Sequence, residues 1–250
     1  MIKPKHLFKK SKHHPSSVLM PADDFRATES YKAIRTNILH LLSNTNGKSI
    51  LLTSPYAGAG KTTTTANLAI TFAQLGKKVL IIDGDMRKPT IHKMFSIPLS
   101  PGLSDIISGE SNTANIKDSG FENLFILTAG TIPSNPAELL SSKSFNELLK
   151  NLSENYDFIF IDAPPVDAVT DAVIISQQVS GTAIVIRQNY TEKTTLIRTV
   201  NALKKVNSNI IGYILNAVDY EKFSYKYGHY SGKYTKKYYN YYRSSVKEDE

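Results

Sequence analysis

Cysteine is absent from all 250 residues of the sequence. Disulfides, zinc–cysteine sites and thiol catalysis are therefore excluded. No apolar run approaches the ~18 residues that a membrane-spanning helix needs, and no secretory signal pattern opens the chain. The composition is otherwise ordinary for a globular protein, with 41% apolar and 21% charged residues. We therefore expect a cytoplasmic protein whose length suits one α/β domain.

The net charge of +8 is confined to the two ends of the chain. Residues 1–14 carry five lysines and no acid, and residues 221–250 carry seven Lys or Arg against four acids. Residues 15–220 therefore balance to zero, which argues against a surface that coats nucleic acid. The basic start is either a solvated, disordered terminus or an arm that lies beside an anionic membrane leaflet.

Apolar runs alternate with helical patterns along the body of the chain. The runs are continuous, as strands covered on both faces require, and predict strands at Ser49–Thr53, Val79–Asp83, Leu124–Thr128, Phe158–Asp162, Thr182–Ile186 and Ile210–Asn216. Apolar residues at helical spacing predict helices at Ala27–Leu42, Thr62–Leu75, Ser144–Ser153, Ala168–Gln177 and Glu192–Lys205. This alternation indicates a single α/β domain, a doubly wound and mostly parallel sheet flanked by helices.

A glycine-rich loop connects the first predicted strand to a helix and reads SPYAGAGKT over residues 54–62. Gly58 and Gly60 let successive N–H groups face one anion, and the helix N-terminus adds its positive dipole. Lys61 would reach the β- and γ-phosphates of a nucleotide, and the Thr62 hydroxyl would ligate Mg²⁺. The strict motif has glycine where Pro55 stands, but the strand–loop–helix context indicates a P-loop NTPase. The predicted nucleotide-binding residues of the loop are Ala57, Gly58, Ala59, Gly60, Lys61, Thr62 and Thr63.

Acidic residues follow two of the predicted strands. Asp83 ends the second strand, with Asp85 just beyond it, and Asp162 ends the fourth. Ligands bind at the carboxyl ends of strands in open α/β sheets. A lone aspartate at such a place is often only a helix cap. Three carboxylates beside a phosphate loop instead indicate a divalent cation, or one of them acting as a base.

The composition changes from about Tyr220 onward. Nine of the 14 tyrosines fall in the last 31 residues, among Lys, Ser, Gly and Asn and almost no aliphatic residue. Such a segment cannot bury enough apolar surface to offset its ordering entropy. We therefore expect a flexible tail over residues 220–250.

The combination of GAGKTTTTANLA, IIDGDMRKP, FIFIDAPPVDAVTDA and the tyrosine-rich tail resembles the bacterial tyrosine kinases. It is most similar to the cytoplasmic form found in Gram-positive capsule and exopolysaccharide gene clusters. The resemblance covers roughly residues 25–242, and with it the chain divides into a basic arm (1–24), a kinase domain (25–219) and an acceptor tail (220–250). It also implies ATP with Mg²⁺ as cofactor, phosphoryl transfer to tyrosine, and a role in regulating capsule or exopolysaccharide synthesis.

The resemblance further implies roles for single residues. Asp85 would accept the tyrosine proton, Arg87 would stabilise charge or contact a neighbouring subunit, and Asn216 would contact adenine. The catalytic set comprises Lys61, Asp83, Asp85 and Arg87. The metal set comprises Thr62, Asp83 and Asp162. The phosphate acceptors, reached in trans, are Tyr225, Tyr227, Tyr230, Tyr234, Tyr238, Tyr239, Tyr241 and Tyr242.

Assembly and partners are implied in the same way. Glu29, Lys32 and Arg35 resemble the E-x-x-R-x-x-R helix motif through which the family forms a ring-like homo-oligomer. Lys32 replaces an arginine, so a bidentate guanidinium contact becomes a point charge. The alternative is a solvated helix face with i, i+3 charge pairs. The family also implies a membrane-anchored activator that recruits the kinase to the inner face of the cell membrane, a cognate phosphotyrosine phosphatase, and no nucleic-acid partner.

Two other functions compete with the kinase interpretation. A partition or division-site ATPase would be a dimerising switch without kinase activity, but those proteins carry an additional lysine near the start of the loop, where this chain has Tyr56. A non-catalytic scaffold would use the tyrosines as aromatic stickers, or stack them on single-stranded nucleic acid. The scaffold would leave the lysine and the acids of the loop without a use.

Overall fold

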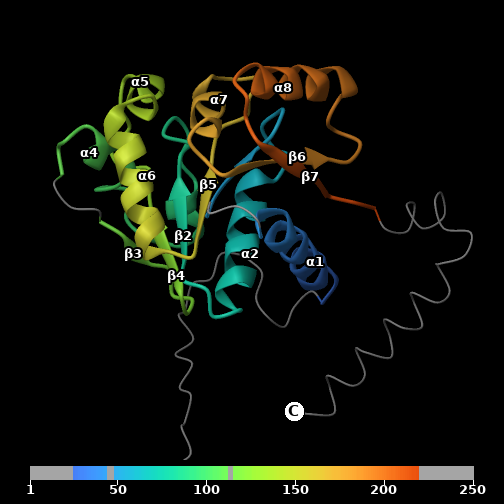
Figure 1. Cartoon of the computed structure of the whole chain (residues 1–250), viewed down its shortest axis with the longest axis horizontal. Coiled ribbons are helices and arrows are strands. Elements are labelled where there is room, and N and C mark those ends of the chain that lie inside the picture. The colour runs from blue at the N-terminus through green and yellow to red at the C-terminus, as the bar shows by residue number, and fades with distance from the viewer. Residues whose placement is uncertain (1–24, 44–47, 112–114, 220–250) are drawn as a thin grey trace, which may run out of the picture.

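Residues 25–43, 48–111 and 115–219 are described in a computed structural model of the protein. A seven-stranded sheet forms its centre, in the order β3-β4-β2-β5-β1-β6-β7 (Figure 1). The strands are β1 (Ser49–Thr53), β2 (Val79–Asp83), β3 (Lys117–Asp118), β4 (Leu124–Leu127), β5 (Phe158–Asp162), β6 (Gly181–Arg187) and β7 (Ile210–Asn216). All neighbouring strands are parallel except β3 and β4. The predicted doubly wound, mostly parallel sheet is confirmed.

Helices cover both faces of this sheet (Figure 1). One face carries α1 (Phe25–Leu42), α2 (Lys61–Ala73) and α3 (Ile91–Met94). The opposite face carries α4 (Leu103–Ile107), α5 (Pro136–Leu140), α6 (Lys143–Asn155) and α7 (Asp171–Ser176). After β6 comes α8 (Lys193–Lys205), which contacts α7. On the first face, the ring centroid of Phe72 lies 4.6 Å from that of Phe158 and 5.0 Å from that of Phe160.

The central strands are apolar throughout because their alternate residues enter the two cores. In β2, Val79 and Ile81 pack with α2, whereas Leu80 and Ile82 pack on the opposite side. Such a strand has no solvated face, which is the reason for its continuous apolar sequence. Parallel pairing then sets the ends of the strands beside one another, and the register of β2 with β5 places Asp83 opposite Asp162.

Four short elements are absent from the sequence prediction. Helices α3, α4 and α5 have only four or five residues each, which is too short for a helical repeat to show in the sequence. Strand β3 has two residues and pairs antiparallel with β4. The helix predicted at Ala168–Gln177 begins later, at Asp171.

Within the described ranges, no helix combines the length and the apolarity that crossing a membrane requires. The basic arm (1–24) and the tyrosine-rich tail (220–250) lie outside the described residues.

Candidate functional site

The phosphate loop lies between β1 and α2, at the carboxyl edge of the sheet. Gly58 and Gly60 have φ values of 78° and 89°, in the left-handed region that favours glycine. A Cβ at Gly60 would also lie 2.0 Å from Nδ2 of Asn216. No side chain caps the first turn of α2, so its amides remain available to an anion. The backbone therefore has the form that a phosphate site needs.

Lys61 and Thr62 meet two of the predicted aspartates beside this loop. Lys61 Nζ lies 3.3 Å from Oδ2 of Asp162 and 3.5 Å from Oδ2 of Asp85. The Thr62 hydroxyl donates a 2.6 Å hydrogen bond to Oδ2 of Asp162. Burial disfavours the charge on Lys61, but attraction from Asp162, Asp85 and Asp83 outweighs burial and raises its pKa. The structure thus brings together groups that are up to about a hundred residues apart in the chain.

Asp83 is fully buried and binds the backbone rather than the lysine. Its Oδ2 accepts hydrogen bonds from the N–H groups of Thr90 and Ile91, each at 3.1 Å, and its Oδ1 accepts one from Asp85 N–H at 3.3 Å. Burial, together with the nearby charge of Asp162, raises the pKa of Asp83 to about 8. Asp83 therefore anchors the segment that leads into α3 and also contributes to the electrostatics of the site.

The donor set fits Mg²⁺ held together with a nucleotide. A hydroxyl oxygen and a carboxylate oxygen lie side by side at Thr62 and Asp162, and both are hard ligands of the kind that Mg²⁺ prefers. Two buried carboxylates, Asp85 and Asp162, face one lysine, so a divalent cation would offset the excess negative charge. Across the described ranges, no group of three or more His, Cys, Asp or Glu side chains could hold a metal ion by itself. Thr62 and Asp162 would therefore share the ion with phosphate oxygens and water.

Arg87 is bound to a buried carboxylate on another element. Its Nε lies 2.8 Å from Oδ2 of Asp171, the first residue of α7, and its Nη2 lies 3.1 Å from Oδ1. The Arg87 side chain is 40% exposed, whereas that of Asp171 is completely buried. This two-point contact fixes the guanidinium on the α7 side of the loop that follows β2. Sequence reasoning did not identify Asp171 as its partner, because the two residues are 84 positions apart.

Three side chains at the ends of β6 and β7 contact consecutive carbonyls of the phosphate loop. The carbonyls of residues 57, 58 and 59 accept hydrogen bonds from Tyr190, Arg187 and Asn216, at 3.1, 3.0 and 2.9 Å respectively. Asn216 is among the predicted residues, and it lies against the loop. Arg187 and Tyr190 were missed, although both follow the strand predicted at Thr182–Ile186, at the edge where ligands bind.

Tyr56 occupies the position at which the switch ATPases carry their additional lysine. Its hydroxyl pairs with that of Thr195 in α8, at 2.5 Å. The Tyr56 ring meets Tyr190 edge-on, with 6.4 Å between the centroids. The position is therefore occupied by a neutral aromatic side chain that packs within the same molecule.

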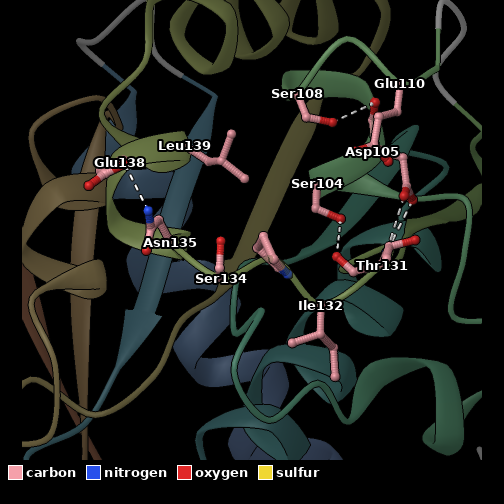
Figure 2. A pocket seen from close by; sticks show the side chains of 11 residues that line it. Ser104, Asp105, Ser108, Glu110, Thr131, Ile132, Ser134, Asn135, Glu138 and Leu139 are labelled. Atoms are coloured by element: carbon pink, nitrogen blue, oxygen red, sulfur yellow. Dashed lines mark hydrogen bonds between the residues drawn. The ribbon is translucent and has the colours of Figure 1, made fainter.

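A separate pocket of about 470 Å³ opens beside α4 and the loop that precedes α5 (Figure 2). Hydroxyl or carboxyl groups are present in seven of the eleven lining residues, which are Ser104, Asp105, Ser108, Glu110, Thr131, Ile132, Pro133, Ser134, Asn135, Glu138 and Leu139. The lining does not include Lys61, Thr62, Asp83, Asp85 or Asp162. Burial opposes the ionised form of Asp105, but hydrogen bonds from Thr131 and Gly102 outweigh burial and lower its pKa. Asp105 is therefore a structural anchor of this loop.

The predicted assembly residues lie on α1. Lys32 Nζ contacts Oε1 of Glu29 at 2.7 Å, and both side chains are more than 40% exposed. Arg35 instead donates a 2.6 Å hydrogen bond to the carbonyl of Thr71 in α2. Glu29 and Lys32 are thus on the surface, whereas Arg35 also joins two helices of its own subunit. The predicted acceptor tyrosines, Tyr225 to Tyr242, lie outside the described residues.

Comparison with known proteins agrees with this geometry. Residues 47–212 match the family described as AAA domain, which contains the phosphate loop and all three strand-end acids. The chain is therefore a nucleotide-binding domain of the P-loop class. It is 42% identical over 207 residues to tyrosine-protein kinase YwqD of Bacillus subtilis, covering 82% of this chain and 87% of that protein. It is 39% identical over 204 residues to putative tyrosine-protein kinase CapB of Staphylococcus aureus, covering 81% and 90%. The chain belongs to the bacterial tyrosine-protein kinases.

Solved structures show the same relationship. The kinase domain of Escherichia coli tyrosine kinase ETK superimposes with a TM-score of 0.75, at 29% identity and 84% coverage of each chain. The cell division ATPase MinD of Pyrococcus furiosus gives a lower TM-score of 0.59, at 28% identity, with 68% of this chain and 71% of that chain covered. The P-loop fold is shared with the switch ATPases, and the closer agreement is with the kinase domain.

Proposed function

We propose that this chain transfers the γ-phosphoryl group of ATP to tyrosine side chains, including those of its own tail. One observation carries the proposal: the Lys61 ammonium, the Thr62 hydroxyl and the Asp85 and Asp162 carboxylates meet beside a phosphate loop in a chain that belongs to the tyrosine-protein kinases. Phosphoryl transfer rests mainly on positioning and charge, and this group of side chains supplies both.

The roles follow from the contacts of each group. Lys61 and the loop amides would bind the phosphates, and Thr62 and Asp162 would hold Mg²⁺, which offsets charge on the phosphate oxygens. Asp85 would take the proton of the acceptor tyrosine. The tyrosine oxygen would then bond to the γ-phosphorus, while the bond between the γ-phosphorus and the bridging β-phosphate oxygen breaks and ADP is released. Asp85 suits this role because its Oδ1 is oriented by Lys88 N–H at 3.0 Å, while its Oδ2 faces Lys61.

Asp83 and Arg87 would act at the edge of the same site. Asp83 lies opposite Asp162 and holds the segment before α3, so it would support the metal rather than bind the tyrosine. Arg87 is fixed by Asp171, and its 40% exposed side chain leaves the outer side of the guanidinium free to stabilise charge or contact a neighbour.

A mixing experiment tests transfer and its direction together. A chain ending at residue 219 keeps the site and lacks the tail, whereas full-length Lys61→Met keeps the tail and lacks the lysine. Incubated together with ATP and Mg²⁺, they should yield phosphotyrosine in the tail of the Lys61→Met chain, by mass spectrometry. The same mixture with Asp85→Ala in the truncated chain is the control for the base. ATP hydrolysis without any phosphotyrosine, even when the cytoplasmic segment of an activator is present, would favour a switch ATPase instead.

We also propose a ring-like homo-oligomer that uses the exposed Glu29–Lys32 pair of α1. Glu29→Lys together with Lys32→Glu would preserve this internal pair and reverse its polarity toward a neighbour. Analytical ultracentrifugation should then show smaller species than wild type. Each phosphotyrosine adds about −1.5 to −2 charges at pH 7, so a phosphorylated tail would weaken the ring by repulsion. Equal sedimentation of the phosphorylated and dephosphorylated protein would contradict this.

Family membership supports a cellular setting that completes the proposal. The kinase would work in the cytoplasm, recruited to the inner face of the membrane by a membrane-anchored activator, and a phosphotyrosine phosphatase would reverse its action. The regulated process would be capsule or exopolysaccharide synthesis. Loss of membrane association on deletion of the activator gene, seen by cell fractionation, is the expected result.

A further inference from the structure

We propose that Arg187, Tyr190 and Asn216 are positioning residues of the phosphate loop, and that together they set the direction of its N–H groups. We call these three side chains the carbonyl clamp. Each donates one hydrogen bond to one of three consecutive loop carbonyls, at 2.9 to 3.1 Å. The proposal concerns nucleotide binding alone and is independent of which group accepts the phosphate.

The clamp acts through the geometry of the peptide bond. In a planar trans peptide, the carbonyl of one residue and the N–H of the next point in opposite directions. The clamped carbonyls of residues 57, 58 and 59 therefore fix the N–H groups of Gly58, Ala59 and Gly60, directing them away from the clamp. These amides belong to the set predicted to hold the phosphates. A flexible glycine-rich loop would otherwise lose conformational entropy when an anion binds, and the clamp reduces that loss beforehand.

The clamp itself is supported by the turn between β6 and α8. Arg187 N–H donates to the Thr191 hydroxyl at 3.1 Å, and its carbonyl accepts from Thr191 N–H at 3.0 Å. Gln188 N–H donates to the carbonyl of Asn216 at 3.0 Å, which joins this turn to the end of β7. The Arg187 guanidinium also lies 5.4 Å from the centroid of the Tyr190 ring. The three donors thus belong to one connected unit, so they hold the loop from a fixed side.

Gly60 shows how closely this unit approaches the loop. A Cβ at Gly60 would displace the Asn216 amide from the loop. At Gly58 a Cβ would lie 3.7 Å from the Tyr190 hydroxyl, an ordinary contact. The glycine at 60 therefore serves the clamp as well as the phosphates, whereas the glycine at 58 is required for its φ of 78°.

The sharpest test is Tyr190→Phe, because it removes one hydroxyl and keeps the ring. Binding of Mg²⁺–ADP to the full chain is measured by calorimetry, and adenosine, which lacks phosphates, by competition. We expect Tyr190→Phe to weaken ADP binding about 3- to 10-fold, as loss of one hydrogen bond implies. Arg187→Ala should give a similar loss and the double variant about 10- to 100-fold. Adenosine binding should stay unchanged for all three.

Matched controls and contrary results complete the test. Tyr213→Phe removes a hydroxyl from an exposed tyrosine of β7, and Lys204→Ala removes a positive charge from α8; both should bind ADP as wild type does. ADP affinities of Tyr190→Phe and Arg187→Ala within twofold of wild type would overturn the clamp. Asn216→Ala should weaken ADP and spare adenosine, and equal loss of both would remove Asn216 from the clamp and assign it to the base.

Discussion

The Arg87–Asp171 contact allows structural and catalytic roles of Arg87 to be separated. Arg87→Ala would leave the Asp171 carboxylate buried without its charged partner. Removing one member of a fully buried pair costs about 3–5 kcal/mol, and exposed pairs contribute about 1 kcal/mol or less. Because Arg87 is 40% exposed and water screens it, we expect an intermediate loss of about 2 kcal/mol in the free energy of unfolding. For a domain of this size that corresponds to a fall in Tm of roughly 4–8 °C.

A double-mutant cycle measured by urea unfolding tests this magnitude. Asp171→Asn removes the buried charge, so the double variant Arg87→Ala/Asp171→Asn should recover more than half of the stability lost in Arg87→Ala. Arg87→Lys keeps the charge and loses the two-point contact, and should fall between wild type and Arg87→Ala. Strictly additive losses, or an Arg87→Ala loss below about 0.5 kcal/mol, would refute the structural reasoning. If the double variant regains stability but not phosphoryl transfer, Arg87 also serves catalysis.

Two further predictions concern charge and space at the site. The pKa of Asp83 is about 8 in the folded chain against 3.8 as its ordinary value, so its stabilising contribution is present below about pH 4 and is lost as the pH rises toward 8. Relative to Asp83→Asn, wild type should therefore lose up to about 1.4 kcal/mol per pH unit across this window in urea unfolding without Mg²⁺, and parallel curves would contradict it. Gly60→Ala should weaken Mg²⁺–ADP binding, because a Cβ at a φ of 89° would displace the Asn216 amide, which lies 2.0 Å from its position, whereas Gly109→Ala, at a similar φ of 82° with no atom within 4 Å, should cost only about 1–2 kcal/mol of stability and keep binding.

The nucleotide loop and the acids were predictable because each depends on local sequence. Gly58 and Gly60 are needed for their own φ values, and Asp162 ends a strand whose apolar run is visible in the sequence. The short elements α3, α4, α5 and β3 were not predictable, since none is long enough to show a period. Arg187 and Tyr190 were missed for a different reason. Their partners are loop carbonyls 129 and 133 residues away, and a backbone acceptor leaves no sequence signal.

The sequence by itself determined the class of protein. Hydrophobic periodicity, glycine at positions of positive φ and acids after apolar runs are local properties, and they are sufficient for a parallel α/β sheet with a phosphate loop. Tertiary structure alone decided which charged side chains lie next to one another. It placed Asp83 opposite Asp162 and paired Arg87 with Asp171. It also placed Lys61 beside both Asp85 and Asp162. These contacts arise because parallel strands bring their carboxyl ends to one edge, where groups distant in the chain become neighbours and change one another's energies.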